Sequence, residues 1–425
     1  MRIQKLVLKN FRKYEDASFA FHPKFTILIG ENGAGKTTIL DAVAIMLATY
    51  FQGSGIKIGR STIAKTDKRL VISEKAGQVF SETQKEVYLS AAGSLHDAPL
   101  NWRRDAGDRG GKAKKLVSLG SKDRERISSG ESPDLPLLLY YGSGRLWDVH
   151  RHIETEKPSS QLDAYRFCLD PKSNQKAFEK WFKKISTSPR QKQLGFPALQ
   201  VVTKAVMNCI PGATDFFFDT DMEEVIIKFH DGHYDLFNNL SDGYRNMVAM
   251  VADIAHRASR LNPHFAEDSA LRSSGIVLID EIDLHLHPRW QRAVVRDLQG
   301  AFPNLQFIAT THSPFIIQSA ASGEVIDLNQ SAELEPTLAE GVASPPARAE
   351  YVNRSIEDIA EYVMGVEDVQ RSERYQEMYD VAKKYYKLLE DSKDADPEEK
   401  EHLKNRLDIG SRLSTHHPFT ECRRR

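Results

Sequence analysis

Four short apolar runs mark candidate strands along the chain, at residues 25–29, 135–141, 276–279 and 305–309. Runs of this kind, bounded by polar or glycine-rich turns, are typical of strands buried on both faces of a parallel sheet. Apolar positions at helical spacing follow the first run, between Thr38 and Leu47, and recur from Met247 to Ala258. Strands and helices in this arrangement predict an α/β fold with a parallel core sheet.

Residues 52–130 carry a different pattern. Short β-like runs at residues 69–73 and 86–89 alternate with polar turns, which predicts an antiparallel side sheet. The segment from Arg103 to Arg126 holds nine Lys or Arg against four Asp or Glu, so we expect a mobile basic loop at the surface. Contact between this loop and nucleic acid is the less favoured alternative.

Residues 145–235 are expected to form a helical insertion with a hairpin. Between residues 160 and 210, lysines interleave with aromatic residues such as Phe178 and Trp181. An amphipathic helix with its aromatics in the core is the default interpretation, and a surface that stacks nucleic acid is the alternative. Residues 222–229 and 232–237 form the predicted hairpin.

After residue 330 the chain becomes charged and helical. Ser355 and Asp358 match a capping box that opens a helix through Met364, and a polar helical stretch follows at residues 372–408. We therefore divide the chain into a head, residues 1–330, and a helical C-terminal region, residues 331–425, expected to serve self-assembly or partner docking.

Net charge, apolar run lengths and cysteine positions exclude several classes of protein. The 425 residues carry a formal net charge of −1, which excludes a globally basic nucleic-acid-binding surface. The N-terminal segment has no signal-peptide core, and no apolar run approaches the roughly 18–20 residues that span a bilayer, so we expect a cytoplasmic protein without membrane contact. Cys168, Cys209 and Cys422 stand at unrelated positions and predict neither a zinc site nor a disulfide framework.

The strongest chemical motif runs from Gly30 to Thr37 and is called the P-loop below. It matches G-x-x-x-x-G-K-[ST] and lies between a predicted buried strand and a predicted helix. In that context backbone N–H groups cradle a polyphosphate, Lys36 reaches the β- and γ-phosphates, and Thr37 holds Mg²⁺. The sequence thus predicts binding of a nucleoside triphosphate.

Two further motifs follow predicted strands of the core sheet. Asp280 and Glu281 end the run at 276–279, where Asp280 can hold Mg²⁺ and Glu281 can polarise an attacking water as general base. Burying two adjacent carboxylates without a metal or a partner is costly, which disfavours a merely structural turn. His312 follows the run at 305–309 and is well placed to contact the γ-phosphate.

A third motif, Leu240 to Arg245, precedes the helix that contains Met247. Ser241 is the expected N-cap, and the amides of Ser241 to Gly243 at a helix N-terminus would form an anion site. Standing alone, the motif would be an ordinary helix cap. One P-loop is enough to bind the phosphates of one nucleotide. A second phosphate-binding site in the same chain therefore suggests that each nucleotide site is completed by residues of another subunit.

In this order the three motifs resemble those of ABC-type ATPases of the SMC, RecF and OLD group. Leu8 to Arg12 looks like that group's N-terminal L-x-N-F-[RK] strand, whose basic residue, here Arg12, lies near the nucleotide. Leu240 to Arg245 resembles the family signature, with Asp242 where transporter sequences have glycine. Asp283 to Pro288 resembles the D-loop that crosses the dimer interface. The resemblance implies two heads that sandwich ATP, the P-loop of one facing the signature of the other.

The sequence lacks several features found in members of this group, which limits the kind of member it can be. Between Lys36 and Ser241 no sustained heptad run occurs, so no long coiled-coil arm is expected. Asp394-Ala395-Asp396 follows no apolar strand, so the nuclease domain of OLD-type proteins is not expected. A Q-loop glutamine is not assignable, and the loop after Tyr141 is its expected place.

The run at 138–147 and the segment at 353–359 are similar to the PtuA ATPases of Septu-type and retron-associated anti-phage systems. That resemblance implies an ATPase that forms a homo-oligomer, regulates a separate HNH nuclease (PtuB-like), and meets nucleic acid through the complex. ATP and Mg²⁺ are the implied cofactors. The expected catalytic residues are Lys36, Glu281 and His312, the metal ligands are Thr37 and Asp280, and the nucleotide-binding residues are Arg12, Gly30, Asn32, Gly33, Ala34, Gly35, Lys36, Thr37, Thr38, Ser241, Asp242 and Gly243.

Two alternatives remain open from the sequence. A RecF-like DNA-repair ATPase that binds duplex DNA is supported by the local basic segments. A structural nucleotide clamp with little hydrolysis is the other, although the presence of Glu281 argues for at least residual turnover.

Overall fold

The computed structural model describes residues 1–75, 78–107, 111–144, 160–171, 175–187, 197–329 and 354–362, together with Met364. The chain forms two compact units, Met1–Ile359 and Ala360–Arg425. The predicted helical stretch at 372–408 and the acidic Asp394-Ala395-Asp396 lie outside the described residues, and the predicted boundary at residue 330 falls at the edge of a further such stretch.

A five-stranded parallel sheet forms the core of the first unit. Its strands, in the order β14-β3-β13-β12-β8, are β14 (Val325–Asp327), β3 (Phe25–Ile29), β13 (Leu305–Thr310), β12 (Gly275–Ile279) and β8 (Leu137–Tyr141). Every residue of β3, β12 and β13 is buried, which explains their uninterrupted apolar sequences. The predicted α/β class and the four predicted strands are confirmed.

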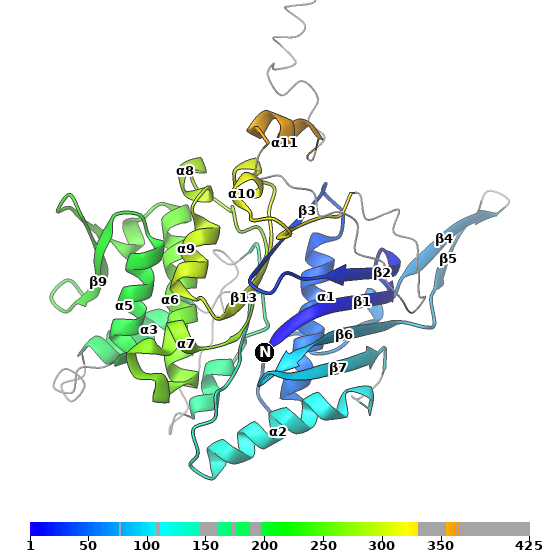
Figure 1. Cartoon of the computed structure of the whole chain (residues 1–425), viewed down its shortest axis with the longest axis horizontal. Coiled ribbons are helices and arrows are strands. Elements are labelled where there is room, and N and C mark those ends of the chain that lie inside the picture. Colours follow the sequence, from blue (N-terminus) through cyan, green and yellow to red (C-terminus); the bar gives the residue numbers. More distant parts are fainter. Residues whose placement is uncertain are drawn as a thin grey trace, which may run out of the picture. The chain divides into compact units, whose positions relative to one another are not determined.

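Helix α1 (Lys36–Ala48) lies between this sheet and a second one (Figure 1). It contacts β12 and β13 on one side and β6 of the second sheet on the other. All of its residues except Thr37 are buried, so the helix needs no polar face. The P-loop helix is therefore held between two sheets.

The second sheet is antiparallel, with the order β2-β1-β6-β7. Its strands are β1 (Arg2–Phe11), β2 (Tyr14–Ala20), β6 (Tyr88–Leu95) and β7 (Ala98–Asp105). Trp102 of β7 donates a hydrogen bond to the carbonyl oxygen of Met46 in α1, which ties the sheet to the helix. The predicted antiparallel sheet is present, but half of it comes from the first twenty residues rather than from residues 52–130.

A separate two-stranded ribbon, β4 (Leu70–Lys75) with β5 (Gln78–Thr83), extends away from this sheet (Figure 1). The three most exposed apolar side chains of the ribbon are Leu70, Ile72 and Val79, at 57%, 70% and 72%. Leu70 pairs with Thr83, Ile72 with Ser81, and Val79 with Glu74, so the three share one face. The ribbon thus has one apolar face open to solvent.

The prediction of a mobile basic loop from Arg103 to Arg126 is wrong. The described part of that segment is the end of β7, a 3₁₀ turn (Gly111–Ala113), and helix α2 (Lys114–Ser128). Leu116, Gly120 and Asp123 of α2 are buried at helical spacing, and a β-carbon on Gly120 would lie 2.1 Å from the carbonyl oxygen of Tyr50. A glycine and an aspartate stand at two contact positions, so the hydrophobic pattern did not reveal this helix.

Helices pack against the other side of the core sheet, and a small antiparallel sheet lies beyond them, in the green and yellow segments of Figure 1. The helices are α3 (Gln175–Thr187), α5 (Pro197–Cys209), α6 (Asp242–Leu261), α7 (Ser269–Arg272), α8 (Pro288–Gln291), α9 (Val294–Ala301) and α10 (Pro314–Ser319), and the sheet has the order β11 (Tyr234–Leu236), β10 (Glu224–Phe229), β9 (Ala213–Asp219). Helix α11 (Ile356–Tyr362) spans the boundary between the two units and is not one of these helices.

The predicted hairpin is confirmed as β10 and β11, and the predicted helical character of residues 160–210 is confirmed within the described residues. In α3, Phe182 is fully buried while Lys183 and Lys184 are exposed, as an amphipathic helix requires. Ser355 and Asp358 exchange the two bonds of the predicted capping box before α11. Among the described helices, none is both long and apolar enough to cross a membrane.

Candidate nucleotide-binding site

The parallel sheet brings three predicted motifs to one edge. The P-loop follows β3, Asp280 follows β12, and His312 lies two residues after β13. Because β3 pairs with β13 and β13 with β12, all in parallel, their carboxyl ends lie side by side. Ligands of open parallel sheets bind at this edge. The tertiary fold therefore assembles motifs that are more than 240 positions apart in sequence.

The P-loop turns into α1 at Gly35, the N-cap residue, whose φ of 99° lies in the left-handed region. A β-carbon at this position would also lie 2.5 Å from the hydroxyl oxygen of Tyr14. Conformation and space therefore both require glycine here. The backbone of the loop is mostly at the surface, since Glu31, Asn32 and Gly33 are exposed while Ala34 is buried.

Lys36 folds back over the loop that precedes it. Its Nζ donates hydrogen bonds to the carbonyl oxygens of Gly30, at 2.7 Å, and Glu31, at 3.0 Å. The residue is only 8% exposed, and burial lowers the pKa of Lys36, whereas the nearby carboxylates of Asp280 and Glu281 oppose this shift. A compact cation thus lies directly above the loop where a polyphosphate would bind.

Thr37 and Asp280 meet across the site. The Thr37 hydroxyl donates to the carboxylate of Asp280, 3.0 Å from Oδ2 and 3.3 Å from Oδ1. The hydroxyl of Thr310, at the end of β13, donates to Asp280 Oδ1 at 2.7 Å and accepts from the backbone N–H of Glu281 at 2.7 Å. A hydroxyl and a carboxylate at this separation are the oxygen ligands that Mg²⁺ takes in nucleotide sites, so this pair fits the ion.

Glu281 and His312 lie on neighbouring strand ends, and both side chains are partly exposed. Asp283 connects the two segments: its Oδ1 accepts from the Thr311 hydroxyl at 2.6 Å and from the backbone N–H of His312 at 3.4 Å. Sequence reasoning placed Asp283 in the predicted D-loop but did not identify its contact with the histidine segment. The contact holds the backbone of His312 beside the acidic loop.

Arg12 belongs to a ring of charges in which the two carboxylates are buried and the two arginines are partly exposed. It donates to Asp41 at 2.5 Å and to Asp67 at 3.0 Å, and Arg60 donates to the same two carboxylates. The Nη1 atom of Arg12 is also 3.5 Å from the Thr38 hydroxyl at the start of α1. Burial would lower the pKa of Arg12, but Asp41 and the other carboxylate outweigh it and the pKa is raised. The predicted nucleotide residue is thus fixed against the P-loop helix.

Sequence reasoning missed Asp41, Arg60 and Asp67. Asp41 lies in an otherwise apolar helix and is 8% exposed, a buried-charge position that signals a partner. The hydroxyl of Tyr140 in β8 also donates to Asp41, at 3.1 Å. An aspartate in an otherwise apolar helix is visible in the sequence and indicates a buried charge. Its arginine and tyrosine partners could be identified only from the fold.

The turn between β1 and β2 holds the P-loop from the outside. Lys13 Nζ donates to the carbonyl oxygen of Gly33 and the Tyr14 hydroxyl to that of Ala34, both at 2.9 Å. Burial raises the pKa of Tyr14, so its hydroxyl remains a donor at neutral pH. These two positioning residues directly follow Arg12 and were also missed.

The predicted signature begins helix α6, with Ser241 at the N-cap position. Its side chain makes no capping hydrogen bond, so the position agrees with the prediction but the contact does not form. Ser241 is exposed, and Asp242 pairs with Arg245 at 2.5 Å. A β-carbon on Gly243 would lie 2.2 Å from the carbonyl oxygen of His285, so the signature packs against the predicted D-loop.

Within the described residues, no hydrogen bond or ion pair joins Ser241, Asp242 or Gly243 to the P-loop of the same chain. The fold thus brings Lys36, Thr37, Asp280, Glu281 and His312 to one sheet edge, with Arg12 behind them. It does not connect the signature to them. The expected place of the Q-loop, after Tyr141, lies largely in residues 145–150, outside the described part of the chain.

Comparisons with known proteins identify relatives of this chain. The chain is 28% identical to the "Retron Vc95 probable ATPase" of Vibrio cholerae serotype O1 biovar El Tor, over 78% of this chain and 74% of that protein. It is 26% identical to the Septu protein PtuA of Bacillus mycoides, over 80% of this chain but only 42% of that longer protein. Among solved structures, an SMC head bound to the C-terminal winged-helix domain of ScpA covers 75% of this chain and is itself covered over 93%, with a TM-score of 0.43 and 16% identity.

A protein-family profile matches residues 25–318, from the strand before the P-loop to the helix after His312. The match covers well over half of the chain and includes every motif at the sheet edge. The chain therefore belongs to the family described as "AAA domain, putative AbiEii toxin, Type IV TA system", and it is similar over most of its length to the ATPases of retron and Septu defence systems.

Proposed function

We propose that this protein binds and hydrolyses ATP as the regulatory ATPase subunit of an anti-phage defence complex. The observation that carries the proposal is the contact between Thr37 and Asp280, because it joins the P-loop to the acidic strand end in the geometry of a nucleotide site. Similarity to retron and Septu ATPases supports the defence setting.

Each residue at the sheet edge has a chemical role in this proposal. Backbone N–H groups of the P-loop and Lys36 bind the β- and γ-phosphates, which requires Lys36 to exchange its carbonyl partners for phosphate oxygens. Thr37 and Asp280 would hold Mg²⁺, which neutralises charge on the phosphates. Glu281 orients and deprotonates the attacking water, and His312 contacts the γ-phosphate from the neighbouring strand.

A second subunit completes the site in this proposal. Ser241 is exposed and is the N-cap residue of α6, whose first N–H groups can bind phosphate. Among the described residues, no polar contact joins Ser241 to the P-loop of its own chain. In a dimer, the N-terminus of α6 would face the P-loop of the other copy and bind the phosphates of the nucleotide held there. ATP would then stabilise a dimer of heads, and hydrolysis would release it.

The nuclease of the complex is proposed to be a separate HNH protein, and the ATP state of the head dimer would control it. A RecF-like role in binding duplex DNA is less well supported, because arginines of the predicted basic loop bond within the chain. Arg103 pairs with Asp105, Arg126 pairs with Glu131, and Arg124 donates to the carbonyl oxygens of Tyr50 and Gln52.

Nucleotide binding by Lys36→Ala protein tests this function. We expect ATP affinity to fall at least tenfold and hydrolysis to disappear, because the buried lysine that lies over the loop is removed. Lys9→Ala is the matched control, since Lys9 of β1 forms an exposed pair with Asp16 of β2 and its loss should leave both quantities unchanged. Normal ATP affinity in the Lys36 variant would refute the proposed site.

The proposed control of a separate nuclease is tested by measuring nucleic-acid cleavage. Purified wild-type protein alone should cut neither DNA nor RNA, and adding the HNH protein should produce cleavage that changes with the Lys36→Ala substitution. Cleavage by this chain without a partner would contradict the proposed division of labour.

A further inference from the structure

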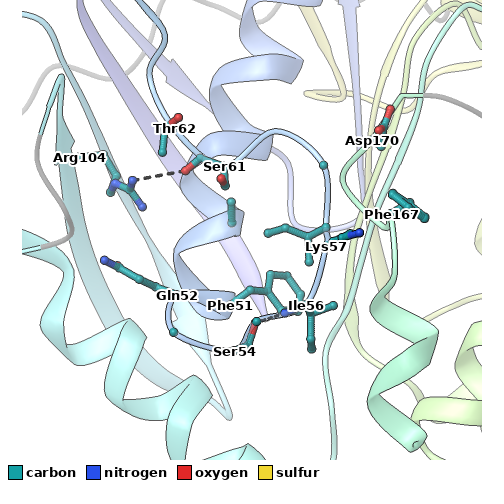
Figure 2. A pocket seen from close by; sticks show the side chains of 15 residues that line it. Phe51, Gln52, Ser54, Ile56, Lys57, Ser61, Thr62, Arg104, Phe167 and Asp170 are labelled. Carbon is teal, nitrogen blue, oxygen red and sulfur yellow. Dashed lines mark hydrogen bonds between the residues drawn. The ribbon is translucent and has the colours of Figure 1, made fainter. Parts of the chain in front are cut away.

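A cavity of about 670 Å³ lies beside the far end of the P-loop helix. Ala48 and Phe51 line it from the end of α1, the loop of residues 52–62 surrounds it, and Arg104 of β7 reaches it (Figure 2). Its volume is within the range of small-molecule sites, roughly 300–1,000 Å³. No predicted site residue lines it.

The cavity is separate from the P-loop. Lys36 and Ala48 are the first and last residues of α1, and twelve steps of 1.5 Å place them about 18 Å apart along the helix. A nucleotide bound at Lys36 would therefore not fill this space. The two regions are connected, however, because Arg60 in the loop beside the cavity pairs with Asp41 in the middle of α1.

The walls of the cavity are fixed by backbone hydrogen bonds. The N–H of Phe167 donates to the carbonyl oxygen of Lys57 at 2.7 Å, and that of Leu169 donates to Ile58 at 2.8 Å. Gly59 allows this approach, since a β-carbon there would lie 2.6 Å from the backbone nitrogen of Asp170. A wall built in this way offers a preformed site rather than a loose loop.

Arg104 provides a fixed cation in the wall. It is 4% exposed, and its guanidinium donates to the Thr49 hydroxyl at 3.2 Å and the Ser61 carbonyl oxygen at 3.3 Å. These bonds orient a planar group whose geometry suits phosphate and carboxylate oxygens. Among the described residues that line the cavity, Arg104 and Lys57 are the two cations and Asp170 is the one carboxylate, so this lining favours an anion.

The opposite side of the cavity combines an aromatic ring with charged side chains. Figure 2 shows Phe167 and Asp170 across from Arg104, with Phe51 and Ile56 below. Aromatic rings bind the flat face of a base, and a carboxylate accepts hydrogen bonds from ribose hydroxyls or an amino group. We propose that this cavity is a second ligand site, which binds a nucleoside monophosphate with its phosphate at Arg104 and its base beside Phe167.

Binding of AMP to full-length Lys36→Ala protein, measured by isothermal titration calorimetry, tests the second site with the P-loop disabled. We expect one AMP per chain, and adenosine or inorganic phosphate at least tenfold weaker, because each offers only half of the interactions. Arg104→Met should weaken AMP about tenfold or more. Arg103→Met is the matched control on the same strand, since Arg103 pairs with Asp105 and does not line the cavity, and its affinity for AMP should not change.

Thr62→Trp keeps the proposal falsifiable if the Arg104 variant does not fold. Thr62 is an exposed lining residue, so a tryptophan there fills the cavity without disturbing a buried contact, and AMP binding should be lost. Absence of AMP binding to Lys36→Ala protein, or unchanged binding in the folded Thr62→Trp variant, would overturn the second site. Neither result bears on the P-loop, which ATP binding by the wild type tests separately.

Discussion

The backbone of Gly243 packs against the carbonyl oxygen of His285, so closely that a β-carbon on the glycine would lie 2.2 Å from that oxygen. Gly243 is the second residue of α6, within the predicted signature, and His285 lies in the predicted D-loop. Asp283, two residues earlier, bonds to the segment that carries His312. One loop therefore contacts both the signature and the histidine strand.

Gly243→Ala should disturb this contact. A methyl group must displace the backbone of His285, and overpacking of this kind costs about 1–3 kcal/mol. We expect a lower melting temperature and at least tenfold slower ATP hydrolysis, with ATP affinity close to that of the wild type. Gly300→Ala in α9 is the control, because a β-carbon there meets nothing within 4 Å, and it should be neutral or slightly stabilising. Wild-type hydrolysis in the Gly243 variant would show that the contact is not needed.

Ser241→Arg should block assembly of the two-headed site. The position is exposed in one chain, so the fold tolerates the larger side chain, but its bulk would occupy the space proposed for the γ-phosphate of a second subunit. ATP binding to the monomer should persist while ATP-dependent dimerisation, measured by light scattering, disappears. Ser128→Arg, at the exposed end of α2, should dimerise normally. An ATP-dependent dimer in the Ser241 variant would argue against a site completed in trans.

Glu281→Gln should trap the ATP-bound state. The amide keeps the size of the side chain but cannot take a proton from water, and loss of a general base typically slows a reaction about 10²–10⁴-fold. We expect slow hydrolysis with unchanged ATP affinity and a longer-lived dimer. Glu125→Gln, at an exposed position of α2, is the control. If Glu281→Gln hydrolyses ATP at the wild-type rate, another residue is the general base. Separately, steady ATP turnover by the wild-type protein would exclude the alternative of a structural nucleotide clamp.

Asp67→Asn should destabilise the ring of charges in a pH-dependent way. Burial alone would raise the pKa of Asp67, but hydrogen bonds from Arg60, Ala64 and Arg12 outweigh it and lower the pKa. The stabilisation is therefore complete above the unfolded pKa of about 3.9 and is lost as pH falls through the lower folded value. We expect the variant to lose about 2 kcal/mol of unfolding free energy at pH 7, where the wild-type carboxylate is charged and 1% exposed.

Urea unfolding at pH 7 and below pH 4 measures this dependence. The difference between the wild type and Asp67→Asn should shrink in acid, because the wild-type carboxylate becomes neutral there. Asp16→Asn removes an exposed pair with Lys9 and should change stability by less than about 1 kcal/mol at either pH. An equal difference between the wild type and Asp67→Asn at both pH values would mean that the ring contributes through packing rather than charge.

Three elements show where sequence reasoning succeeded and where it failed. The strands β3 and β12 were predicted because every position in them is buried, so their apolar character is continuous. Helix α2 was missed because it is buried through Gly120 and Asp123, whose sequence signal is that of a loop. Burial by close backbone approach or by a buried hydrogen bond, such as that from Tyr50 to Asp123, leaves no hydrophobic pattern.

The sequence by itself identified the residues of the candidate site: the P-loop lysine and hydroxyl, the paired carboxylates after β12, and the histidine after β13 follow from local patterns. Each of them follows a buried strand that the sequence predicts for the parallel core sheet, and the strand pairing brings them to one edge. Only the tertiary structure decided which side chains support them, because Asp41, Arg60 and Asp67 acquire a role through contacts across 19 to 55 residues. Local patterns record what a segment buries, whereas the partner of a buried charge is set by how distant segments pack.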